Sequence, residues 1–353
     1  MIRESIQKLI DGVDLTHEES MAAMKKIMSG EATNAQIGAF LTALRIKGET
    51  TTEITAFTSV MKECCNKIQP RVKGRLVDTC GTGGDKIKTF NISTTAAFVA
   101  TGADVSVAKH GNRSVTSKCG SADVLERLGL NFSIAPEEVE KAIEQVGMGF
   151  IFAPAFHPAM KYAIGPRREL GIRTVFNVLG PLTNPADANA QLLGVYDVRL
   201  TESLACSLKS LGCEEAMVVH GLDGLDEIST IGKTRISWLR NGEVTTLEMA
   251  PKDFGIKQAN LEDIKGTAPE ESAEVTFKIL YGSMDAADPR KEIVQVNGAA
   301  AIIVAGKAED FGYGIETAKE SIDSGNAYKK LKELVRFSGG DLSKLEQLES
   351  KYA

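Results

Sequence analysis

The chain has 353 residues, a formal net charge of -6 at pH 7, and a composition of 43% hydrophobic and 25% charged residues. This composition excludes a disordered chain, a coiled coil and a collagen-like repeat, and the length favours two domains or one small and one large domain. The negative charge argues against a nucleic-acid binder or a membrane-surface binder, since both need a basic face.

No segment predicts a membrane span or a secretion signal. The longest apolar stretches, GFIFAPAF at 149–156 and GAAAIIVAG at 298–306, stay far short of the roughly 20 residues that a spanning helix needs. The first residues, MIRESIQKLI, carry scattered charges and no separate apolar core, unlike a signal peptide. The six cysteines form no C-x-x-C pair, so we expect reduced thiols in a cytoplasmic protein.

Residues 1–70 predict a small all-helical domain. Three capping boxes, each a Thr followed three residues later by Glu or Gln, mark helix starts: Thr16 with Glu19, Thr33 with Gln36, and Thr50 with Glu53. Apolar residues then recur at helical spacing in two stripes: Met21, Met24 and Met28, and Ile37, Phe40, Leu41 and Leu44. Gly48 is a plausible helix stop. We interpret the stripes as core or subunit interface and expect this domain to form a dimer interface.

Residues 71–353 predict a larger α/β domain. Buried strands are expected at LVDTC (76–80), VSVAKH (105–110), GFIFAP (149–154), LLGVYD (192–197) and MVVHG (217–221). Helices are expected near 91–101, 121–128, 137–146, 157–170 and 200–211. This alternation is typical of a mostly parallel central sheet. Asn241-Gly242 between two alternating runs predicts a β-hairpin, and helices return from about 272, with Pro289 at a helix start.

A glycine-rich segment, DTCGTGGDKIKTFNISTTAAF at 78–98, leaves the first predicted strand and enters a helix near Ser93. Its glycines allow backbone amides to approach an anion, and the helix N-terminus adds a favourable dipole. It has neither the G-K-[ST] ending of a Walker loop nor G-x-G-x-x-G. The alternative interpretation is a tight turn. Asp85 could contact a hydroxyl or a metal-bound water.

The segment KHGNRS at 109–114 follows the second predicted strand and concentrates cationic side chains. Lys109, His110 and Arg113 fall within five positions, and Gly111 allows close backbone approach. Open α/β sheets bind ligands at the carboxyl ends of their strands, so this loop suits a polyanion such as pyrophosphate. The alternative is a solvated basic loop.

Two further segments carry charges suited to binding. In FHPAMKYAIGPRREL, at 156–170, His157 opens a predicted helix and Arg167 and Arg168 lie near its end. An arginine is a natural carboxylate receptor, although a helix-end cation is the alternative. In GLDGLDE, at 221–227, Asp226 and Glu227 offer oxygen ligands of the kind that Mg²⁺ uses together with substrate phosphates; an exposed acidic loop is the alternative.

Taken together, the four segments lie at predicted strand ends of one domain. They offer amides and cations for phosphates, carboxylates for Mg²⁺ and an arginine for an organic anion, and no Ser-His-Asp or Cys-His nucleophile is apparent. We therefore expect transfer of a group from a phosphorylated donor.

The ordered motifs GTGGD, NIST, KHGNRS, GPRRELGIRTVFN and GLDE resemble the anthranilate phosphoribosyltransferase family over essentially the whole chain. The resemblance implies a nucleoside-phosphorylase-like fold, a homodimer and a role in tryptophan biosynthesis. It implies transfer of the 5-phosphoribosyl group from 5-phosphoribosyl 1-pyrophosphate (PRPP) to anthranilate with Mg²⁺ and release of pyrophosphate.

The resemblance also implies site residues. For PRPP they are Gly81, Gly84, Asp85, Thr89, Asn91, Ile92, Ser93, Thr94, Lys109, His110, Gly111, Asn112, Arg113, Ser114, Val115, Thr116, Ser117 and Ser121. For Mg²⁺ they are Ser93, Asp226 and Glu227, and for anthranilate they are Gly81, His110, Asn112, His157 and Arg167. Lys109 is expected to stabilise the leaving group electrostatically; no acid or base is assigned.

Three alternatives remain open at this stage. A pyrimidine nucleoside phosphorylase shares the fold, but phosphorolysis does not need the GLDE metal loop, and KHGNRS differs from that family's glycine-rich stretch. A non-enzymatic, nucleic-acid-binding relative would have a basic groove and eroded carboxylates, against the charge of -6 and the intact Asp226-Glu227 pair. A phosphoribosyltransferase with another aromatic acceptor is the third.

Overall fold

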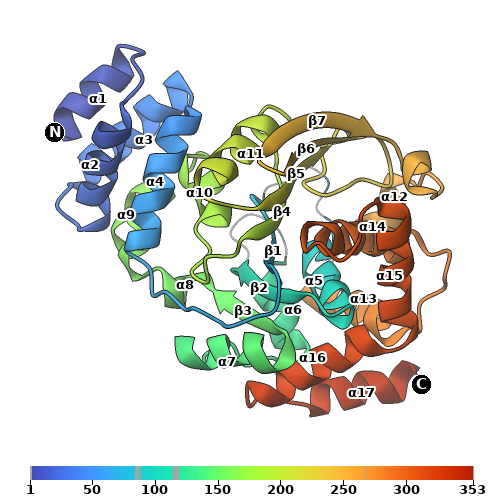
Figure 1. The fold of residues 1–353 in the computed structure, drawn as a ribbon. Coiled ribbons are helices and arrows are strands. Elements are labelled where there is room, and N and C mark those ends of the chain that lie inside the picture. The colour runs from blue at the N-terminus through green and yellow to red at the C-terminus, as the bar shows by residue number, and fades with distance from the viewer. Residues whose placement is uncertain (1, 84–86, 88, 114–118, 267, 353) are drawn as a thin grey trace.

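A seven-stranded sheet forms the centre of the molecule (Figure 1). The computed structural model describes residues 2–83, 87, 89–113, 119–266 and 268–352. The strand order is β3-β2-β1-β4-β5-β6-β7. The parallel strands are β1 (Leu76–Gly81), β2 (Ser106–Gly111), β3 (Met148–Phe152), β4 (Ala190–Gly194) and β5 (Glu215–Gly221). β6 (Thr234–Arg240) and β7 (Glu243–Met249) add an antiparallel edge, so the predicted mostly parallel sheet is confirmed.

The predicted hairpin and helix caps are present. Asn241 and Gly242 join β6 to β7 with φ of 53° and 76°, the left-handed geometry that suits a two-residue turn. All three capping boxes form, at the starts of α2 (His17–Met28), α3 (Asn34–Lys47) and α4 (Thr51–Glu63). Gly48, with φ of 89°, ends α3 as expected. With α1 (Ile2–Ile10) these helices form the helical unit at the left of Figure 1.

The remaining helices cover and flank the sheet. They are α5 (Ile92–Gly102), α6 (Ser121–Arg127), α7 (Pro136–Val146), α8 (Ala153–Phe156), η1 (Pro158–Met160), α9 (Lys161–Leu170), α10 (Phe176–Leu182), α11 (Leu200–Ser210), η2 (Pro251–Phe254), α12 (Leu261–Ile264), α13 (Pro269–Tyr281), α14 (Pro289–Val304), α15 (Phe311–Asp323), α16 (Asn326–Phe337) and α17 (Ser343–Tyr352). None of the helices in these described stretches is long and apolar enough to cross a membrane.

Three predicted boundaries differ from the structure. β3 ends at Phe152 because Pro154 has no amide hydrogen to donate to a ladder, and α8 begins there instead. The single helix expected over 157–170 is divided, since His157 precedes Pro158 and has the non-helical angles φ -118° and ψ 67°. β4 spans 190–194 rather than 192–197, pairing from Ala190 with β1 and β5.

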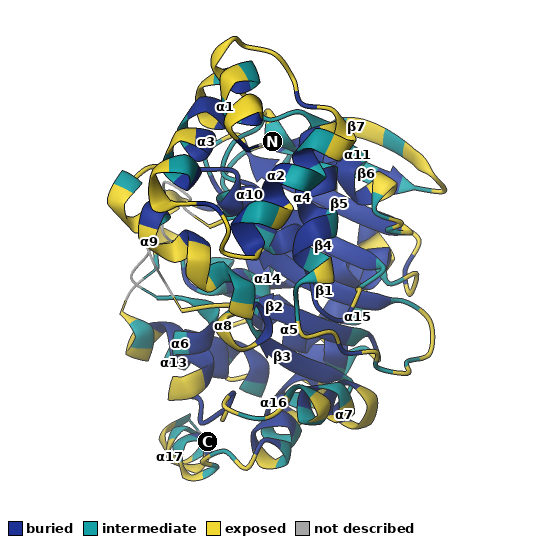
Figure 2. Cartoon of the chain, turned by 90° about the vertical axis from the view of Figure 1, so that its left-hand side faces the viewer, coloured by how far each residue is buried: buried dark blue, intermediate teal, exposed yellow. Residues whose placement is uncertain are grey.

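Successive residues of the central strands contribute to different cores. Leu192 packs in the core formed with α5 and α14, whereas Leu193 packs in the core shared with the helical unit. This follows from the two-residue period of a strand. Figure 2 shows the result: the parallel strands β1 to β5 are mostly buried, whereas the edge strand β7 is largely exposed. The two faces of the sheet therefore have different neighbours, which matters at the site.

The helical unit does not pack only within itself. α9 contacts α2 and α3, and α10 contacts α4. The buried side chains of Ala163 and Phe176 accordingly belong to the same core as Phe40 and Phe57. A segment from the middle of the chain thus completes the packing of its first helices, while the expected boundary between residues 70 and 71 remains a prediction.

Candidate active site

Four neighbouring parallel strands end in glycine at one edge of the sheet. These are Gly81 of β1, Gly111 of β2, Gly194 of β4 and Gly221 of β5. A Cβ on Gly194 would overlap the backbone carbonyl of Asp226, and one on Gly81 would lie 3.0 Å from its Oδ2. The glycines thus let the β5–β6 loop approach the ends of β1 and β4. This is also where the strand order reverses, the usual ligand crevice of open α/β sheets.

Lys109 lies at the centre of the first group of site residues. It is 2% exposed, and its Nζ donates to the Thr79 carbonyl at 2.5 Å and lies 3.4 Å from Ser93 Oγ. Ser93 in turn donates its backbone N–H to Glu227 Oε1 at 3.2 Å. Burial lowers the pKa of Lys109, while the negative charges of Asp78 and Glu227 oppose that shift. The structure therefore brings together Lys109, Ser93 and Glu227, three of the residues expected at PRPP and Mg²⁺.

In the acidic loop between β5 and β6, the carboxylates point toward different partners. Asp223 turns back on the loop and accepts hydrogen bonds from Ser229 Oγ at 2.5 Å and Leu225 N at 3.1 Å. Asp226 and Glu227 instead lie toward β1 and α5. Within the described residues no three His, Cys, Asp or Glu side chains gather as a metal site. Two carboxylates fit a Mg²⁺ that takes its other ligands from water and substrate phosphates.

The basic loop after β2 is tied to α6. Arg113 is exposed and pairs with Asp123 at 3.0 Å and Glu126 at 2.8 Å, which raises its pKa. Asn112 is exposed, with its Oδ1 accepting from the Arg113 amide, and its carbonyl accepts from Ser121 Oγ. Gly111 lies so close to Ser121 that a side chain there would clash. Arg113, expected as one of the cations of the PRPP site, is thus already paired with two carboxylates of α6.

Other expected PRPP residues surround the start of α5. Asn91 occupies the N-cap position of α5, and its Oδ1 accepts a hydrogen bond from Ser272 Oγ. Thr89 forms an isolated β-bridge with Lys265. Ile92 packs in the core, so only its backbone could contact a ligand. Thr94 is buried with no hydrogen-bond partner for Oγ1. Six expected residues lie outside the described part of the chain: Gly84, Asp85, Ser114, Val115, Thr116 and Ser117.

Two histidines form a second group on the opposite face of the sheet. The rings of His110 and His157 have centroids 5.0 Å apart, and both Nε2 atoms are buried without a partner. Burial lowers the pKa of His110 to about 3 and that of His157 to about 4, so both are neutral at pH 7. Because Lys109 and His110 are consecutive in β2, they point to opposite faces. The strand thereby separates the expected donor and acceptor sides.

Arg167 lies near the end of α9, the helix that follows His157 and η1. Its Cζ lies 5.2 Å from the centre of the Phe176 ring, and burial lowers the pKa of its guanidinium. It forms no ion pair with any carboxylate in the ranges that the structure describes. A half-buried arginine without a carboxylate suits an anionic ligand.

Comparison with known proteins assigns this architecture to a family. Residues 73–328 match the model described as "Glycosyl transferase family, a/b domain", and residues 3–65 match its helical bundle domain. A curated relative from Acetivibrio thermocellus, anthranilate phosphoribosyltransferase, is 52% identical over 97% of this chain and 98% of its own. The chain belongs to the anthranilate phosphoribosyltransferase family.

Solved structures of the family agree over the full length. The Thermus thermophilus anthranilate phosphoribosyltransferase is 39% identical, with a TM-score of 0.89 over 95% of this chain and 99% of that one. The Saccharomyces cerevisiae enzyme, solved in complex with PRPP and Mg, is 29% identical, with a TM-score of 0.87 over 96% and 98% of the two chains. The resemblance and the fold class expected from the sequence motifs are therefore confirmed.

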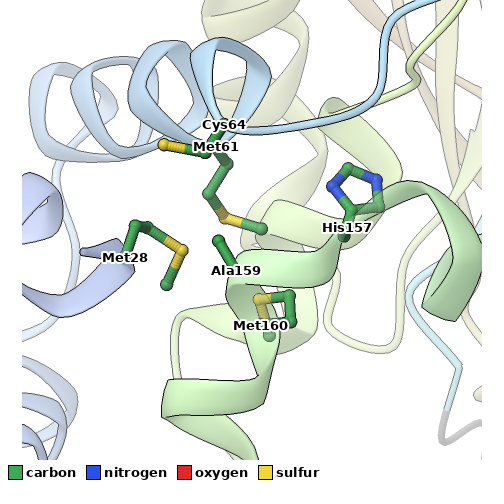
Figure 3. A pocket seen from close by; sticks show the side chains of 6 residues that line it. All are labelled: Met28, Met61, Cys64, His157, Ala159 and Met160. Atoms are coloured by element: carbon green, nitrogen blue, oxygen red, sulfur yellow. The ribbon is translucent and has the colours of Figure 1, made fainter. Parts of the chain in front are cut away.

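His157 of this family member is held by a sulfur-rich contact with the helical unit. Figure 3 shows Met28 of α2 and Met61 of α4 directed toward η1, with Met160 facing them. The six lining residues, which also include Cys64 and Ala159, leave no space for a water molecule. Methionine fills irregular gaps well, and here it seats the segment that carries His157 against α2 and α4.

Some residues at the site were not expected from the sequence. Thr79 bonds Lys109 and also donates its Oγ1 to the Ser93 carbonyl. Phe176 supplies the aromatic face for Arg167. The strand period offered a signal for Thr79, because it shares a face with Val77 and the core containing α5. No local pattern could have indicated Phe176, because its pairing depends on how α9 and α10 fold back.

Proposed function

We propose that the protein transfers the 5-phosphoribosyl group of PRPP to the amine of anthranilate, releasing pyrophosphate, as a step of tryptophan biosynthesis. The observation that supports this function is that the candidate site residues form two groups at one edge of the sheet, one on each face. Lys109 with the Ser93–Glu227 pair suits a phosphorylated donor, and Arg167 without a carboxylate partner among the described residues suits an anionic acceptor. The names and bound ligands of the family's enzymes support the same assignment.

The reaction requires positioning and charge stabilisation more than proton transfer. The bond from the anomeric carbon to the pyrophosphate oxygen breaks with its electron pair leaving on pyrophosphate, and the amine nitrogen forms the new bond to that carbon and loses one proton. An aromatic amine is already uncharged at pH 7. Lys109 and the backbone amides at the strand ends stabilise the charge that grows on pyrophosphate, and Arg167 orients the acceptor carboxylate.

We propose that Asp226 and Glu227 hold the Mg²⁺, with Ser93 beside them. The oxygen-only donor set fits that ion, and Ser93 already contacts Glu227 through its amide. When bound, Mg²⁺ supplies positive charge that neutralises the leaving pyrophosphate.

A fluorescence assay that follows anthranilate loss tests the proposal. Loss is expected only when PRPP and Mg²⁺ are both present, and omission of either is the control. A protein that leaves anthranilate unchanged but splits a pyrimidine nucleoside with inorganic phosphate would be a nucleoside phosphorylase instead. Retardation of DNA or RNA in a gel at physiological salt, with no turnover, would favour the nucleic-acid-binding alternative.

We further propose that the protein is a homodimer formed through the helical unit and α9. Six of the nine large apolar side chains that the described chain exposes lie there: Ile10, Val13, Ile46, Tyr162, Ile164 and Ile172. Figure 2 shows the exposed sides of α1 and α9 on one side of the molecule. Exposed apolar side chains that gather on one part of a protein often mark an interface. Sedimentation velocity should give a dimer that Ile46→Asp weakens, whereas a native monomer would contradict it.

We place the protein in the cytoplasm. None of the six cysteines, all of which lie in the described part of the chain, forms a disulfide, which suits a reducing compartment. Fractionation of cells carrying the tagged full chain tests this placement.

A further inference from the structure

Asp78 is a fully buried carboxylate directly beneath the candidate active site. Its Oδ1 accepts from the His110 amide at 3.1 Å, and its Oδ2 lies 3.4 Å from Gln191 Nε2. Burial raises the pKa of Asp78, and the neighbouring side chains of Asn184 and Cys80 oppose that shift. Two hydrogen-bond donors thus meet one carboxylate in the interior, and of these only the His110 backbone amide belongs to a residue of the expected ligand-binding set.

The position of Asp78 follows from a separation of two strands. The register between β1 and β2 runs only from Leu76–Ser106 to Val77–Val107, whereas β1 and β4 remain paired as far as Gly81–Gly194. Beyond Val77, side chains rather than a neighbouring strand form hydrogen bonds with backbone groups at the end of β2. Asp78 takes the His110 amide, and Asn184 Nδ2 donates to the Ala108 carbonyl at 2.8 Å. Asp78 therefore holds the end of β2 in place of ladder hydrogen bonds.

The same network fixes residues 180–184, the end of α10 and the two residues after it, here called the 180–184 turn. The Gly180 backbone hydrogen-bonds to the His110 ring. Gln191 Nε2 donates to the Pro181 carbonyl at 2.7 Å while also reaching Asp78. Asp78 thus connects the backbone of His110 with the turn that holds its ring.

These contacts all lie on the acceptor face. Asp78 and Cys80 alternate with Thr79, which points toward Ser93 and Lys109. The hydrogen bonds of Asp78 therefore act on the acceptor side, while its negative charge also acts on Lys109 on the donor side.

We propose that Asp78 is a positioning residue for the acceptor half of the site: by accepting from the His110 amide and Gln191 it fixes the end of β2 that carries the His110 ring and the 180–184 turn against which anthranilate binds. This inference rests on the proposed function, since it names a determinant of acceptor binding. Asp78 acts through these residues and does not contact substrate.

Asp78→Asn tests the proposal with almost no change in volume. Its single carbonyl oxygen cannot accept from all the donors, and its new NH₂ group must face at least one of them. We expect the KM for anthranilate to rise about tenfold, equivalent to about 1.4 kcal/mol, and the KM for PRPP, which the lost charge near Lys109 also affects, to rise clearly less. Gln191→Met removes the amide bridge to Pro181. It should also raise the KM for anthranilate more than that for PRPP, though by a smaller ratio, and it replaces Asp78→Asn as the test if that variant does not fold.

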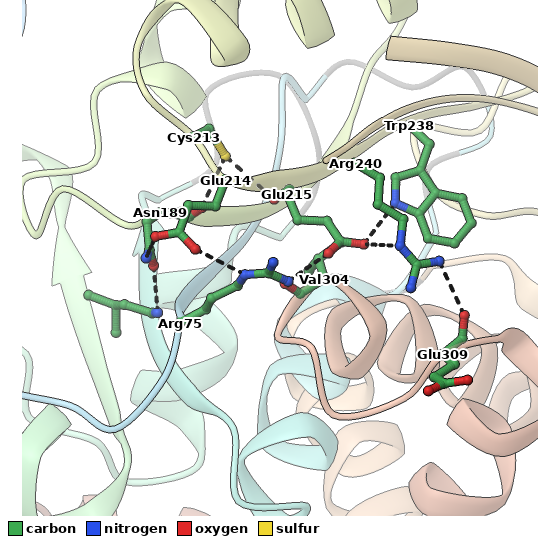
Figure 4. A network of polar contacts seen from close by, with 10 residues as sticks. Arg75, Asn189, Cys213, Glu214, Glu215, Trp238, Arg240, Val304 and Glu309 are labelled. Carbon is green, nitrogen blue, oxygen red and sulfur yellow. Dashed lines mark hydrogen bonds and ion pairs between the residues drawn. The ribbon is translucent and has the colours of Figure 1, made fainter. Parts of the chain in front are cut away.

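Glu215→Gln is the matched control, a buried carboxylate changed to its amide at the opposite end of the same sheet. Figure 4 shows Glu215 between Arg75, at 2.6 Å, and Arg240, with Trp238 donating its indole N–H. Its loss should lower thermal stability and leave the ratio of the two KM values unchanged.

A second measurement does not depend on turnover. The protein has four histidines, so selective ¹⁵N labelling resolves the His110 ring. Because Nε2 has no partner and the ring bonds to the Gly180 backbone, the native tautomer should carry its proton on Nδ1. Asp78→Asn should alter the ring ¹⁵N shifts of His110, whereas Glu215→Gln should not.

Each outcome bears on one proposal. Equal changes in both KM values, or His110 shifts unchanged in Asp78→Asn, would overturn the positioning role. A native enzyme without phosphoribosyl transfer would overturn the proposed function, while the histidine shifts would still test the structural part of the inference.

Discussion

The half-buried guanidinium of Arg167 has an aromatic ring beside it and no carboxylate partner within the described chain. Arginines in proteins of this acidity usually find an acidic neighbour, as Arg113 does with Glu126. Leaving Arg167 uncompensated costs stability unless a ligand supplies the anion. Its environment therefore fits the carboxylate of anthranilate.

Replacing Arg167 with Ala should raise the KM for anthranilate and spare that for PRPP. Hydrogen bonds to charged groups contribute about 1.5–3 kcal/mol, so roughly a tenfold to 150-fold rise is expected. Steady-state kinetics with each substrate varied in turn measures the difference. Arg168→Ala, at the exposed neighbouring position, is the control; equal effects on both substrates would remove Arg167 from the acceptor side.

The neutral histidines predict how stability depends on pH. The folded pKa values of about 3 for His110 and 4 for His157 lie below the unfolded value, so below about pH 6.5 the unfolded state binds more protons. Each histidine should then cost roughly 1.4 kcal/mol of folding stability per pH unit as the pH falls. Urea unfolding between pH 7 and 5 should show a shallower dependence of the unfolding free energy on pH for His110→Gln/His157→Gln than for the native protein; the same slope in both would contradict the prediction.

The sequence predicted which residues form the site better than it predicted the partners of each residue. The sequence indicated Lys109, Ser93 and Glu227, and the structure brings them together. It did not indicate that Arg113 would be paired with α6, because partners ten and thirteen residues away lie on no common periodic pattern. Nor did it indicate Asp78, which resembles any polar residue in a strand until its contacts with His110 and Gln191 are known.

At the scale of elements, local signals predicted starts and stops well. Capping boxes, Asn241-Gly242 and Pro289 depend on neighbouring residues alone, and each is where it was expected. The boundaries that differed depend on distant partners or on proline. The close approach of the acidic loop to Gly194 could not be predicted either, because it brings together segments that are more than thirty residues apart in the sequence.

That approach makes Gly194→Ala a test of the loop. Its methyl group would overlap the Asp226 backbone carbonyl, so the loop must move or the strand end must distort. We expect at least about a tenfold loss of activity and a higher Mg²⁺ concentration for half-maximal rate. Gly38→Ala, where nothing lies within 4 Å of the new methyl, is the control; an unchanged Mg²⁺ response in Gly194→Ala would contradict the metal assignment to this loop.

Removing the loop carboxylates themselves should have a larger effect. Asp226→Ala/Glu227→Ala takes away the two side chains offered to Mg²⁺, and most activity should be lost with an altered metal dependence. Activity titrated with Mg²⁺ after chelation measures this. A double variant with the native response would place the metal elsewhere.

For the whole molecule, alternation of strands and helices indicated an α/β sheet but not the order of its strands. The order β3-β2-β1-β4-β5 depends on long-range pairing, yet it decides which strand ends meet. The net charge of -6 can be interpreted more specifically once the fold is known. It disfavours a long polyanion, whereas Lys109 and Arg167 provide local positive charge for a small one.

The polypeptide passes between the helical unit and the sheet three times: after α4, from β3 into α8, and from α10 into β4. The second passage carries His157, and the third carries the 180–184 turn. Because α9 is packed on α2 and α3, a rigid rotation of the helical unit would carry Arg167 with it and leave Lys109 with the sheet. Opening and closing of the two parts would therefore change the distance between acceptor and donor, so that one movement could admit anthranilate and then bring its amine to the anomeric carbon.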